Sequence, residues 1–327
     1  MAKLATIYGG SGFVGRYIAQ KLAAKGWRVR VAVRRPNEAM FVKPYGAPGQ
    51  VEPVFCNIRN DGSVSAVMQG ADAVINCVGT FDARGRNNFD AVQHEGAERV
   101  ARIAASQGVS SLVHISALGV DRDEDSQYAE SKRLGEEGVL AHFPSATILR
   151  PSVIFGIEDG FFNRFAGMSR MGPVLPIFGG DTKFQPVYVE DVAAAAVMGA
   201  EGAVEGVFEL GGPEAKSLRD WIGVMLTAVH RRRLVPNLPM WIGKIMAWGF
   251  DVLSMLTLGL FSNKILTRDQ VKQLAHDNVV SEDAKGFADL GIEPVAVEAV
   301  IDSYLWRYRP NGQYDAIRDS AKNLRAH

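Results

Sequence analysis

The chain has few cysteines, no excess of either charge and no long uninterrupted hydrophobic run. Its two cysteines, Cys56 and Cys77, are widely separated, which fits neither a disulfide framework nor a metal-ligand spacing. They indicate buried thiols in a reducing compartment. Lysine plus arginine and aspartate plus glutamate both number 36, so the formal net charge is zero. That balance gives no electrostatic reason to expect nucleic acid as the main partner.

Metal ligation and targeting signals are also missing. The six histidines are scattered and form no ligand pattern, so no metal site is predicted. The first predicted strand begins at about Leu4, so no signal or transit peptide is expected ahead of the fold, and a bacterial cytoplasm is the expected compartment. At 327 residues, 47% of them hydrophobic, the chain is long enough for one large α/β domain or for a Rossmann domain with a smaller partner.

A glycine-rich turn near the N-terminus organises the chain. The apolar run 4–8 ends at Gly9, and an amphipathic segment starts at Phe13, which predicts a strand, a tight turn and a helix. Gly9 permits a backbone shape that a Cβ would obstruct. Gly12 permits close approach of a pyrophosphate, and Gly15 permits the helix to pack near the sheet. The anion would bind the free N–H groups at the positive end of the helix, so the turn predicts dinucleotide binding.

The N-terminal half alternates short apolar strands with helices. Strands are predicted at 27–33, 51–55, 73–77 and 111–115, with a helix over 89–107. This alternation predicts an α/β fold: a Rossmann-type doubly wound parallel sheet. The NAD(P)-binding Rossmann domain is expected over residues 1–155, followed by a smaller, mainly helical C-terminal domain over 156–327.

An acidic residue is missing where an NAD-binding enzyme would place one. A preference for NAD needs Asp or Glu about 20 residues after the glycines, to hold the ribose 2′-hydroxyl. No acidic residue occurs between Arg16 and Asn37. The second strand instead ends at Arg34 and Arg35, whose guanidinium groups suit a 2′-phosphate. The predicted cofactor is therefore NADPH rather than NADH, although a solvated basic turn would read the same way.

Other strand ends add candidate cofactor contacts. The third strand is followed by Asn57 and Ile58, where an adenine could lie. The fourth ends in Cys77, Val78 and Gly79, and a glycine at this place admits close approach of a ligand.

Three further residues have the pattern of proton-transfer chemistry. Ser116 stands at the end of the fifth strand, and Tyr128 and Lys132 are four apart on a predicted helix, so they share one face. An ammonium near a phenol lowers the phenol pKa and also holds a ribose. The phenol could then pass a proton during hydride transfer, while the serine polarises a carbonyl. The same residues could equally hold the nicotinamide ribose with no turnover.

These residues carry a family resemblance. The segment from Gly9 to Gly15, together with Ser116, Tyr128 and Lys132, resembles the extended and atypical short-chain dehydrogenase/reductases. Residues 148–156 resemble the family segment that lines the nicotinamide side. Residues 185–192 resemble a later segment that returns the chain to the sheet, so 185–212 is expected to rejoin the Rossmann sheet.

The candidate cofactor-binding set combines the motifs with this resemblance. It comprises Gly9, Ser11, Gly12, Phe13, Val14, Gly15, Arg34, Arg35, Asn57, Ile58, Cys77, Val78, Gly79, Ser116, Tyr128, Lys132, Pro151, Ser152 and Val153.

A narrower match involves five segments. Residues 143–146, 150–159, 161–166, 172–173 and 185–189 resemble the NADPH-binding accessory subunit of respiratory complex I, the NADH:ubiquinone oxidoreductase. That resemblance implies NADPH held as a structural cofactor, other complex I subunits as partners, and docking on the peripheral arm near the membrane. In a bacterium this is the cytoplasmic side of the inner membrane. It also implies that Arg34 binds the 2′-phosphate.

The C-terminal part adds a candidate interface. Three arginines at 231–233 precede the apolar stretch 238–261, which Lys244 and Asp251 interrupt, so a membrane span is not expected. A helical hairpin facing a membrane surface or a partner is predicted, with the arginines at anionic lipid headgroups. A buried helical pair is the alternative. The polar tail 309–327 is expected to order only against a partner.

Three functions fit these features. The first is the non-catalytic accessory subunit that holds NADPH tightly. The second is an active NADPH-dependent reductase or epimerase on a small carbonyl substrate, with Ser116, Tyr128 and Lys132 as its catalytic candidates. The third is an NADPH-sensing regulatory protein. A reductase needs converging polar groups over the nicotinamide, and residues 161–178 offer only Arg164 and Arg170 as charged side chains.

Overall fold

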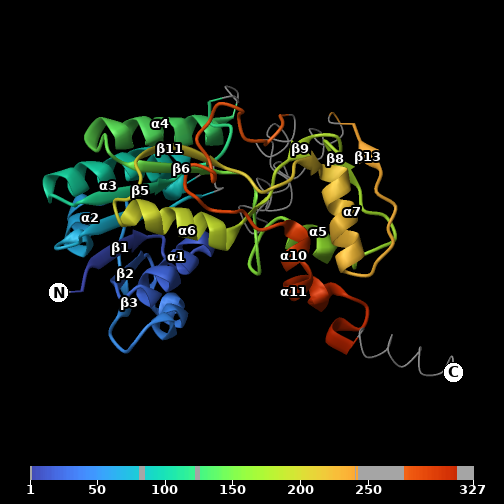
Figure 1. Ribbon diagram of the computed structural model, residues 1–327, viewed down its shortest axis with the longest axis horizontal. Coiled ribbons are helices and arrows are strands. Elements are labelled where there is room, and N and C mark those ends of the chain that lie inside the picture. The colour runs from blue at the N-terminus through green and yellow to red at the C-terminus, as the bar shows by residue number, and fades with distance from the viewer. Residues whose placement is uncertain (1, 81–84, 122–125, 240, 242–275, 315–327) are drawn as a thin grey trace. The chain divides into compact units, whose positions relative to one another are not determined.

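The computed structural model describes residues 2–80, 85–121, 126–239, 241 and 276–314 (Figure 1). Most of the predicted apolar stretch 238–261 and the part of the predicted tail beyond residue 314 lie outside the described residues. The chain divides into two compact units, each built from three stretches. Unit 1 comprises residues 1–152, 189–211 and 280–294, and unit 2 comprises 153–188, 212–279 and 295–327.

Unit 1 is built on a seven-stranded, entirely parallel sheet in the order β11-β6-β5-β4-β1-β2-β3. The order reverses beside β1, where β4 and β2 lie on its two sides. In an open α/β sheet, a ligand crevice lies at the carboxyl ends of the strands at such a switch point. The strands are β1 (Leu4–Tyr8), β2 (Arg28–Val33), β3 (Val51–Phe55), β4 (Ala73–Asn76), β5 (Ser111–Ile115), β6 (Thr147–Pro151) and β11 (Gly206–Leu210).

Helices cover both faces of this sheet (Figure 1). On one face lie α2 (Asp61–Met68), α3 (Glu95–Ser106) and α4 (Gln127–His142), and on the other lie α1 (Phe13–Ala24) and α6 (Val189–Ala200). The inner strands are apolar and buried on both sides, as a doubly covered parallel sheet requires. The sequence-based prediction of a doubly wound α/β fold is confirmed.

The β11 edge of the sheet is covered by a late segment of the chain. The amide of Glu209 donates to the carbonyl oxygen of Lys285 over 2.8 Å, and the Glu209 carboxylate accepts from the amide of Ser281 over 2.7 Å. Residues 280–294 thereby pair with a strand that would otherwise expose its hydrogen-bonding groups. Residues beyond the family-like N-terminal half thus help to complete the sheet.

Unit 2 is held by helices, and its strands are two-residue pairs. Its core gathers aromatic and aliphatic side chains around Trp221, whose indole N–H donates to the carbonyl oxygen of Phe184 over 2.9 Å. Residues 309–314 belong to it, and Arg309 donates to the carbonyl oxygen of Ala228 over 2.8 Å. The elements are β7 (Ile154–Phe155), α5 (Phe162–Met168), β8 (Ile177–Phe178), β9 (Lys183–Phe184), β10 (Val187–Tyr188), β12 (Lys216–Ser217), α7 (Leu218–Ala228), β13 (Asn237–Leu238), α10 (Val297–Val300) and α11 (Asp302–Leu305).

Candidate functional site

The carboxyl ends of the central strands meet at one edge of unit 1. Just beyond β1, the amide of Gly9 donates to the carbonyl oxygen of Ala32 on β2 over 3.0 Å. Beyond β4, the amide of Cys77 donates to the carbonyl oxygen of Tyr8 over 2.9 Å. Beyond β5, the amide of Ser116 donates to Leu149 on β6 over 2.7 Å. These hydrogen bonds between neighbouring strand ends therefore bring most of the predicted site residues to one edge of the sheet.

The glycine turn leaves no room for side chains. Gly9 has a φ of +75°, and a Cβ there would lie 3.1 Å from the carbonyl carbon and oxygen of Cys77. A Cβ on Gly15 would lie 2.6 Å from the carbonyl oxygen of Gly9 and 2.7 Å from the Cα of Gly10. The first turn of α1 is therefore seated directly on the loop, so the turn has the compact geometry that the sequence predicted.

The start of α1 suits an anion. Among the described residues, no side chain caps this helix at Gly12, and its first turn contains no acidic residue. Its N-terminal amides and its dipole therefore favour a phosphate group. Arg16 braces the turn: its Nε donates to the carbonyl oxygen of Gly12 over 3.2 Å and its Nη2 to that of Ser11 over 3.1 Å. Sequence reasoning missed Arg16, which follows the last glycine of the motif.

Arg34 and Arg35 both lie exposed after β2 but differ in their partners. Nη1 of Arg35 pairs with the carboxylate of Glu38 over 3.0 Å. Within the described part of the chain, no side-chain partner of Arg34 is found. Of the two, Arg34 is therefore the guanidinium that is available to an incoming anion.

The two predicted adenine contacts, Asn57 and Ile58, differ in how deeply their side chains are buried. The Asn57 carboxamide oxygen accepts from the amide of Arg59 over 3.2 Å, which fixes the loop after β3. The side chain of Ile58 is buried and packs into the core beneath α3. Asn57 is therefore the better placed of the two to meet a ligand, and Ile58 supports the loop from below.

Ser116, Tyr128 and Lys132 come from β5 and α4. The Lys132 ammonium is buried and donates to the carbonyl oxygen of Ile115, the residue before Ser116, over 2.9 Å. Burial lowers the pKa of Lys132 to about 8, although Glu136 and Cys77 act in the opposite direction. Tyr128 stands one turn earlier on α4. The structure therefore ties the predicted lysine directly to the strand end that carries the serine.

A buried histidine and asparagine lie below these residues on β5 and β4. The Asn76 carboxamide oxygen accepts from the amide of Val78 over 3.1 Å, so its nitrogen faces Nδ1 of His114, 3.2 Å away. Nδ1 must then accept, and Nε2 carries the proton. Burial, with help from Lys132, lowers the pKa of His114 to about 3, which keeps the ring neutral.

The remaining predicted residues occupy the neighbouring strand ends. The Cys77 thiol is shielded by its surroundings, which raise its pKa to about 12, so it is not a reactive thiolate. Pro151 ends β6 and Ser152 is buried beyond it, both in unit 1. Val153 begins unit 2 and so falls outside the unit that carries the other predicted contacts.

Unsatisfied polar atoms mark this region as a ligand site. Among the described residues, four buried side-chain nitrogen or oxygen atoms have no hydrogen-bond partner. They are Nε of Arg59, Oε1 of Gln93, Nε2 of His114 and Oγ of Ser116. Buried polar groups normally have partners, so each of these atoms calls for a polar ligand or water. The cramped glycine turn, the uncapped helix and the orphaned serine oxygen together fit a dinucleotide.

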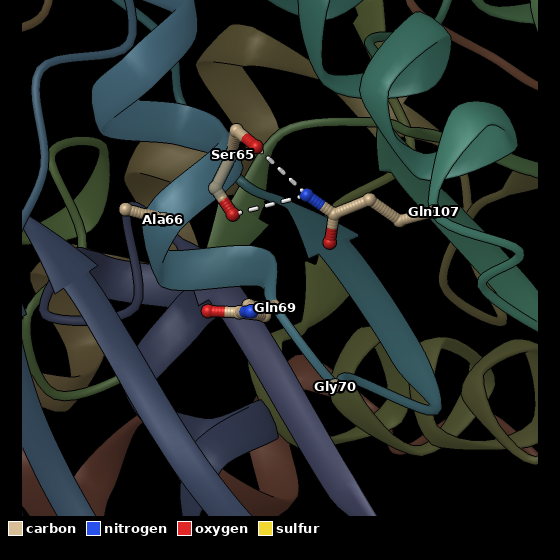
Figure 2. Close-up of a pocket in the computed structure, with 5 residues that line it drawn as sticks. All are labelled: Ser65, Ala66, Gln69, Gly70 and Gln107. Carbon is tan, nitrogen blue, oxygen red and sulfur yellow. Dashed lines mark hydrogen bonds between the residues drawn. The ribbon is translucent and has the colours of Figure 1, made fainter.

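Two hollows in unit 1 lie at the opposite edge of the sheet, near Gly70. One of about 410 Å³ is lined by Ser65, Ala66, Gln69 and Gly70 at the end of α2 and by Gln107 after α3 (Figure 2). There the Gln107 amide nitrogen donates to Oγ of Ser65 over 2.9 Å and to its carbonyl oxygen over 3.1 Å. The side-chain nitrogen of Gln107 therefore already has hydrogen-bond partners within the protein. No cluster of potential metal ligands occurs among the described residues.

Comparison with known proteins gives a family and near-full-length relatives. A family model described as the NAD dependent epimerase/dehydratase family matches residues 5–211. The chain is 34% identical over 316 residues to NADH dehydrogenase [ubiquinone] 1 alpha subcomplex subunit 9, mitochondrial, of Arabidopsis thaliana, covering 94% of this chain and 79% of that protein. It is 31% identical over 323 residues to the NADH-ubiquinone oxidoreductase 40 kDa subunit, mitochondrial, of Neurospora crassa, covering 98% and 84%.

A bacterial relative has a different name. The ceramide reductase of Caulobacter vibrioides is 32% identical over 232 residues, covering 71% of each chain. Among solved structures, DesIV, a dTDP-glucose 4,6-dehydratase from Streptomyces venezuelae, aligns with a TM-score of 0.70 over 93% of this chain and 96% of its own. At 19% identity that likeness shows the fold alone.

Proposed function

This chain belongs to the NAD-dependent epimerase/dehydratase family, and we propose that it serves respiratory complex I as an accessory subunit that holds a nicotinamide dinucleotide. The observation that carries the proposal is the extent of the match. The family model ends at residue 211, whereas the alignments with the two subunits span 316 and 323 residues. They therefore extend past residue 211 into the later parts of the chain, which the features common to the family alone would not explain.

NADPH is the proposed dinucleotide. The end of β2 lacks the acidic side chain that holds a ribose 2′-hydroxyl and carries Arg34 in its place. A free guanidinium at this position supports recognition of a 2′-phosphate, because its fork geometry gives two charge-assisted hydrogen bonds. The unpartnered Oγ of Ser116, just beyond β5, and the buried ammonium of Lys132 on α4 would hold the nicotinamide half.

The cofactor is proposed to act as a structural ligand. A ligand that binds only the folded state stabilises it by mass action, so tight NADPH binding would raise the stability of the subunit. This subunit would then join the peripheral arm of complex I, on the cytoplasmic side of a bacterial inner membrane.

Exposed apolar side chains on unit 2 support a position at a membrane surface or against a partner protein. Residues Val174 and Leu234 pair in a β-bridge, and both are exposed, by 46% and 71%. Met171 is 83% exposed and Trp241 is 62% exposed, while the nearby Arg232 is exposed as well. Apolar side chains beside exposed cations suit anionic headgroups. Within the described residues, no helix is long and apolar enough to cross a membrane.

The test is purification of the tagged protein from native membranes in a gentle detergent. We expect complex I subunits in the eluate, with NADPH in near-stoichiometric amount. A matched pair of variants tests these exposed side chains: Leu234→Glu should reduce recovery with the complex, whereas Phe55→Glu, a site on unit 1 with 62% exposure against 71% for Leu234, should not. A soluble protein recovered alone and without bound dinucleotide would overturn the proposal.

The bacterial relative is the ground for a second candidate function, although the comparisons as a whole do not favour it over the first. Similarity to a ceramide reductase over 71% of the chain, together with Ser116, Tyr128 and Lys132 in place, supports reduction of a carbonyl group on a lipid-like substrate by NADPH. Incubating the purified protein with NADPH and a long-chain carbonyl compound separates the two functions. Oxidation of NADPH that Tyr128→Phe abolishes would establish the reductase, and its absence in an assembled complex supports the accessory subunit.

A further inference from the structure

Gln93 has the orientation of a ligand-binding residue. Its Nε2 donates to Oγ of Ser131 on α4 over 3.1 Å. The Ser131 hydroxyl donates in turn to the carbonyl oxygen of Tyr128 over 2.8 Å, so its oxygen can only accept from Gln93. That polarity fixes which end of the Gln93 amide faces Ser131. Its Oε1 must therefore point elsewhere, and it has no hydrogen-bond partner among the described residues although it is buried.

The backbone beneath Gln93 is also specialised. Gln93 lies in a π-helical turn, η3 (Asp90–His94), which leads into α3. Such turns are rare and occur mainly at functional sites. The turn packs against Gly135 of α4, where a Cβ would overlap the carbonyl oxygen of Gln93. The missing side chain at Gly135 therefore lets Gln93 approach α4 closely enough to reach Ser131.

Oε1 of Gln93 and Nζ of Lys132 converge on one small space beside Gly79. A Cβ built on Gly79 would lie 3.5 Å from Oε1 and 3.9 Å from Nζ, with no closer neighbour. Gly79 itself is exposed, so this space opens to the crevice at the end of β4. One atom placed there would have a hydrogen-bond acceptor on one side and a charged donor on the other.

We propose that Gln93 is a cofactor-contact residue whose Oε1 accepts a hydrogen bond from a ribose hydroxyl of the nicotinamide half, while Lys132 donates to the oxygen of that same hydroxyl. This inference rests on the proposed dinucleotide binding and assigns one contact within it. Arg34 follows β2 and Gly79 lies beyond β4, and these two strands lie on opposite sides of β1, so the 2′-phosphate side lies across β1 from Gly79. The ribose nearer Gly79 is therefore that of the nicotinamide half.

The chemistry of the two groups selects a hydroxyl. A hydroxyl both donates and accepts, so it satisfies Oε1 and Nζ at once. A phosphate or carboxylate oxygen carries no proton and would face the lone pairs of Oε1 unfavourably. A ketone oxygen fails for the same reason. Gln93 thereby distinguishes a sugar from an anion at a point where Lys132 alone would accept either.

The test compares two ligands by calorimetric titration of the full chain. NADPH contains the nicotinamide ribose, whereas adenosine 2′,5′-bisphosphate lacks it. We expect Gln93→Leu to weaken NADPH binding about tenfold, the effect of leaving one such hydrogen bond unmade, and to leave the bisphosphate affinity unchanged. Equal losses for both ligands, or NADPH affinity within twofold of the wild type, would overturn the inference.

Three further variants complete the design. Gln107→Leu removes the other inter-helix amide contact, that with Ser65 at the opposite edge of the sheet, and should change neither affinity (Figure 2). Gln93→Glu keeps the acceptor at Oε1; the Ser131 hydroxyl then turns from the Tyr128 carbonyl to donate to the second carboxylate oxygen, and NADPH should be retained within about threefold. Should Gln93→Leu fail to fold, Ser131→Ala releases the amide and should weaken NADPH alone. If the wild type binds no NADPH, the proposed function fails; if it binds but Gln93→Leu binds equally, only this inference fails.

Discussion

The ammonium of Lys132 lies 2.9 Å from the carbonyl oxygen of Ile115, so α4 is fastened by a charged hydrogen bond to the end of β5. The carboxylate of Glu136, one turn further along α4, is equally buried and pairs with Arg150 over 2.7 Å. A cation enclosed in this way is costly to bury without a ligand. The site is therefore arranged for binding at the expense of the stability of the empty protein.

Replacing Lys132 with Met should stabilise the cofactor-free protein at pH 7. Burial lowers the pKa of Lys132 from its ordinary value to about 8, so between that pH and about 10.5 the unfolded chain binds more protons than the folded one. The cost is thus fully present below pH 8, roughly 3 kcal/mol for a difference of about 2.5 pH units, and disappears as the pH rises to about 10.5. Urea unfolding of wild type and variant between pH 7 and 10.5 should show the difference shrinking. A difference in unfolding free energy that does not change with pH would mean that packing, and not the charge of Lys132, causes it.

His114 should make the protein sensitive to acid. Its pKa in the folded state is about 3 because burial disfavours the charged ring, whereas the unfolded chain protonates near pH 6.5. Stability is therefore lost as the pH falls from about 6.5 towards 3. We expect His114→Gln to flatten this loss in denaturant titrations. The exposed His276→Gln variant serves as the control and should follow the wild-type curve.

Gly15→Ala should destabilise unit 1 and weaken dinucleotide binding together. The added Cβ would overlap the Gly9 carbonyl oxygen and the Gly10 Cα, so the turn must shift, at a cost of about 1–3 kcal/mol. Gly223→Ala is the contrasting variant, because Gly223 lies exposed in α7 with open space around it. That change should stabilise by about 0.5–1 kcal/mol. Thermal unfolding of both variants measures the difference in sign.

Arg34→Glu should reverse the preference between the two dinucleotides. Removing a charge-assisted contact with the 2′-phosphate and adding repulsion should weaken NADPH binding about 10- to 100-fold, with NADH affinity little changed. Arg35→Glu should have a much smaller effect, because Arg35 already pairs with Glu38. Fluorescence titration with both dinucleotides measures this. Equal NADPH affinities in the two variants would remove Arg34 from the proposed site.

The variant Tyr128→Phe distinguishes a structural role of the bound cofactor from a catalytic role. If the subunit is structural, the variant should assemble normally and leave NADH:ubiquinone activity within about twofold of the wild type, because the lost phenol proton takes part in no step. Assembly is followed on native gels and activity in membranes. A large loss of activity with normal assembly would instead favour catalysis at this site.

The sequence predicted the fold class correctly, because the fold class follows from local patterns, whereas the cofactor site at the carboxyl ends of the strands stays a prediction. Strands predicted at 51–55 and 111–115 match β3 and β5 in their bounds, since short apolar runs between turn residues are strong signals. The single helix predicted over 89–107 is instead the π-helical turn η3 followed by α3. Amphipathic spacing gives no sign of this turn, which depends on the space left by Gly135 on another helix.

The partners of buried polar side chains were also beyond sequence reasoning. His114 reads as an ordinary residue of a strand, and only the adjacent strand shows that Asn76 faces it. The sequence does not distinguish Arg34 from Arg35, and only the structure shows that Arg35 forms the ion pair with Glu38. Gln93 is one polar residue among several in its helix, and its burial and orientation come from Ser131.

Residues 280–294 cover β11 at the edge of the sheet. Unit 1 is therefore not completed until after most of unit 2 has been synthesised. The nascent chain makes six of the seven strands of unit 1, passes through the first part of unit 2, and then adds α6 and β11. It crosses unit 2 again before the segment that pairs with Glu209 is translated. The β11 edge therefore stays uncovered until residues 280–294 have been made, so unit 1 cannot be completed before the chain has passed through unit 2 twice.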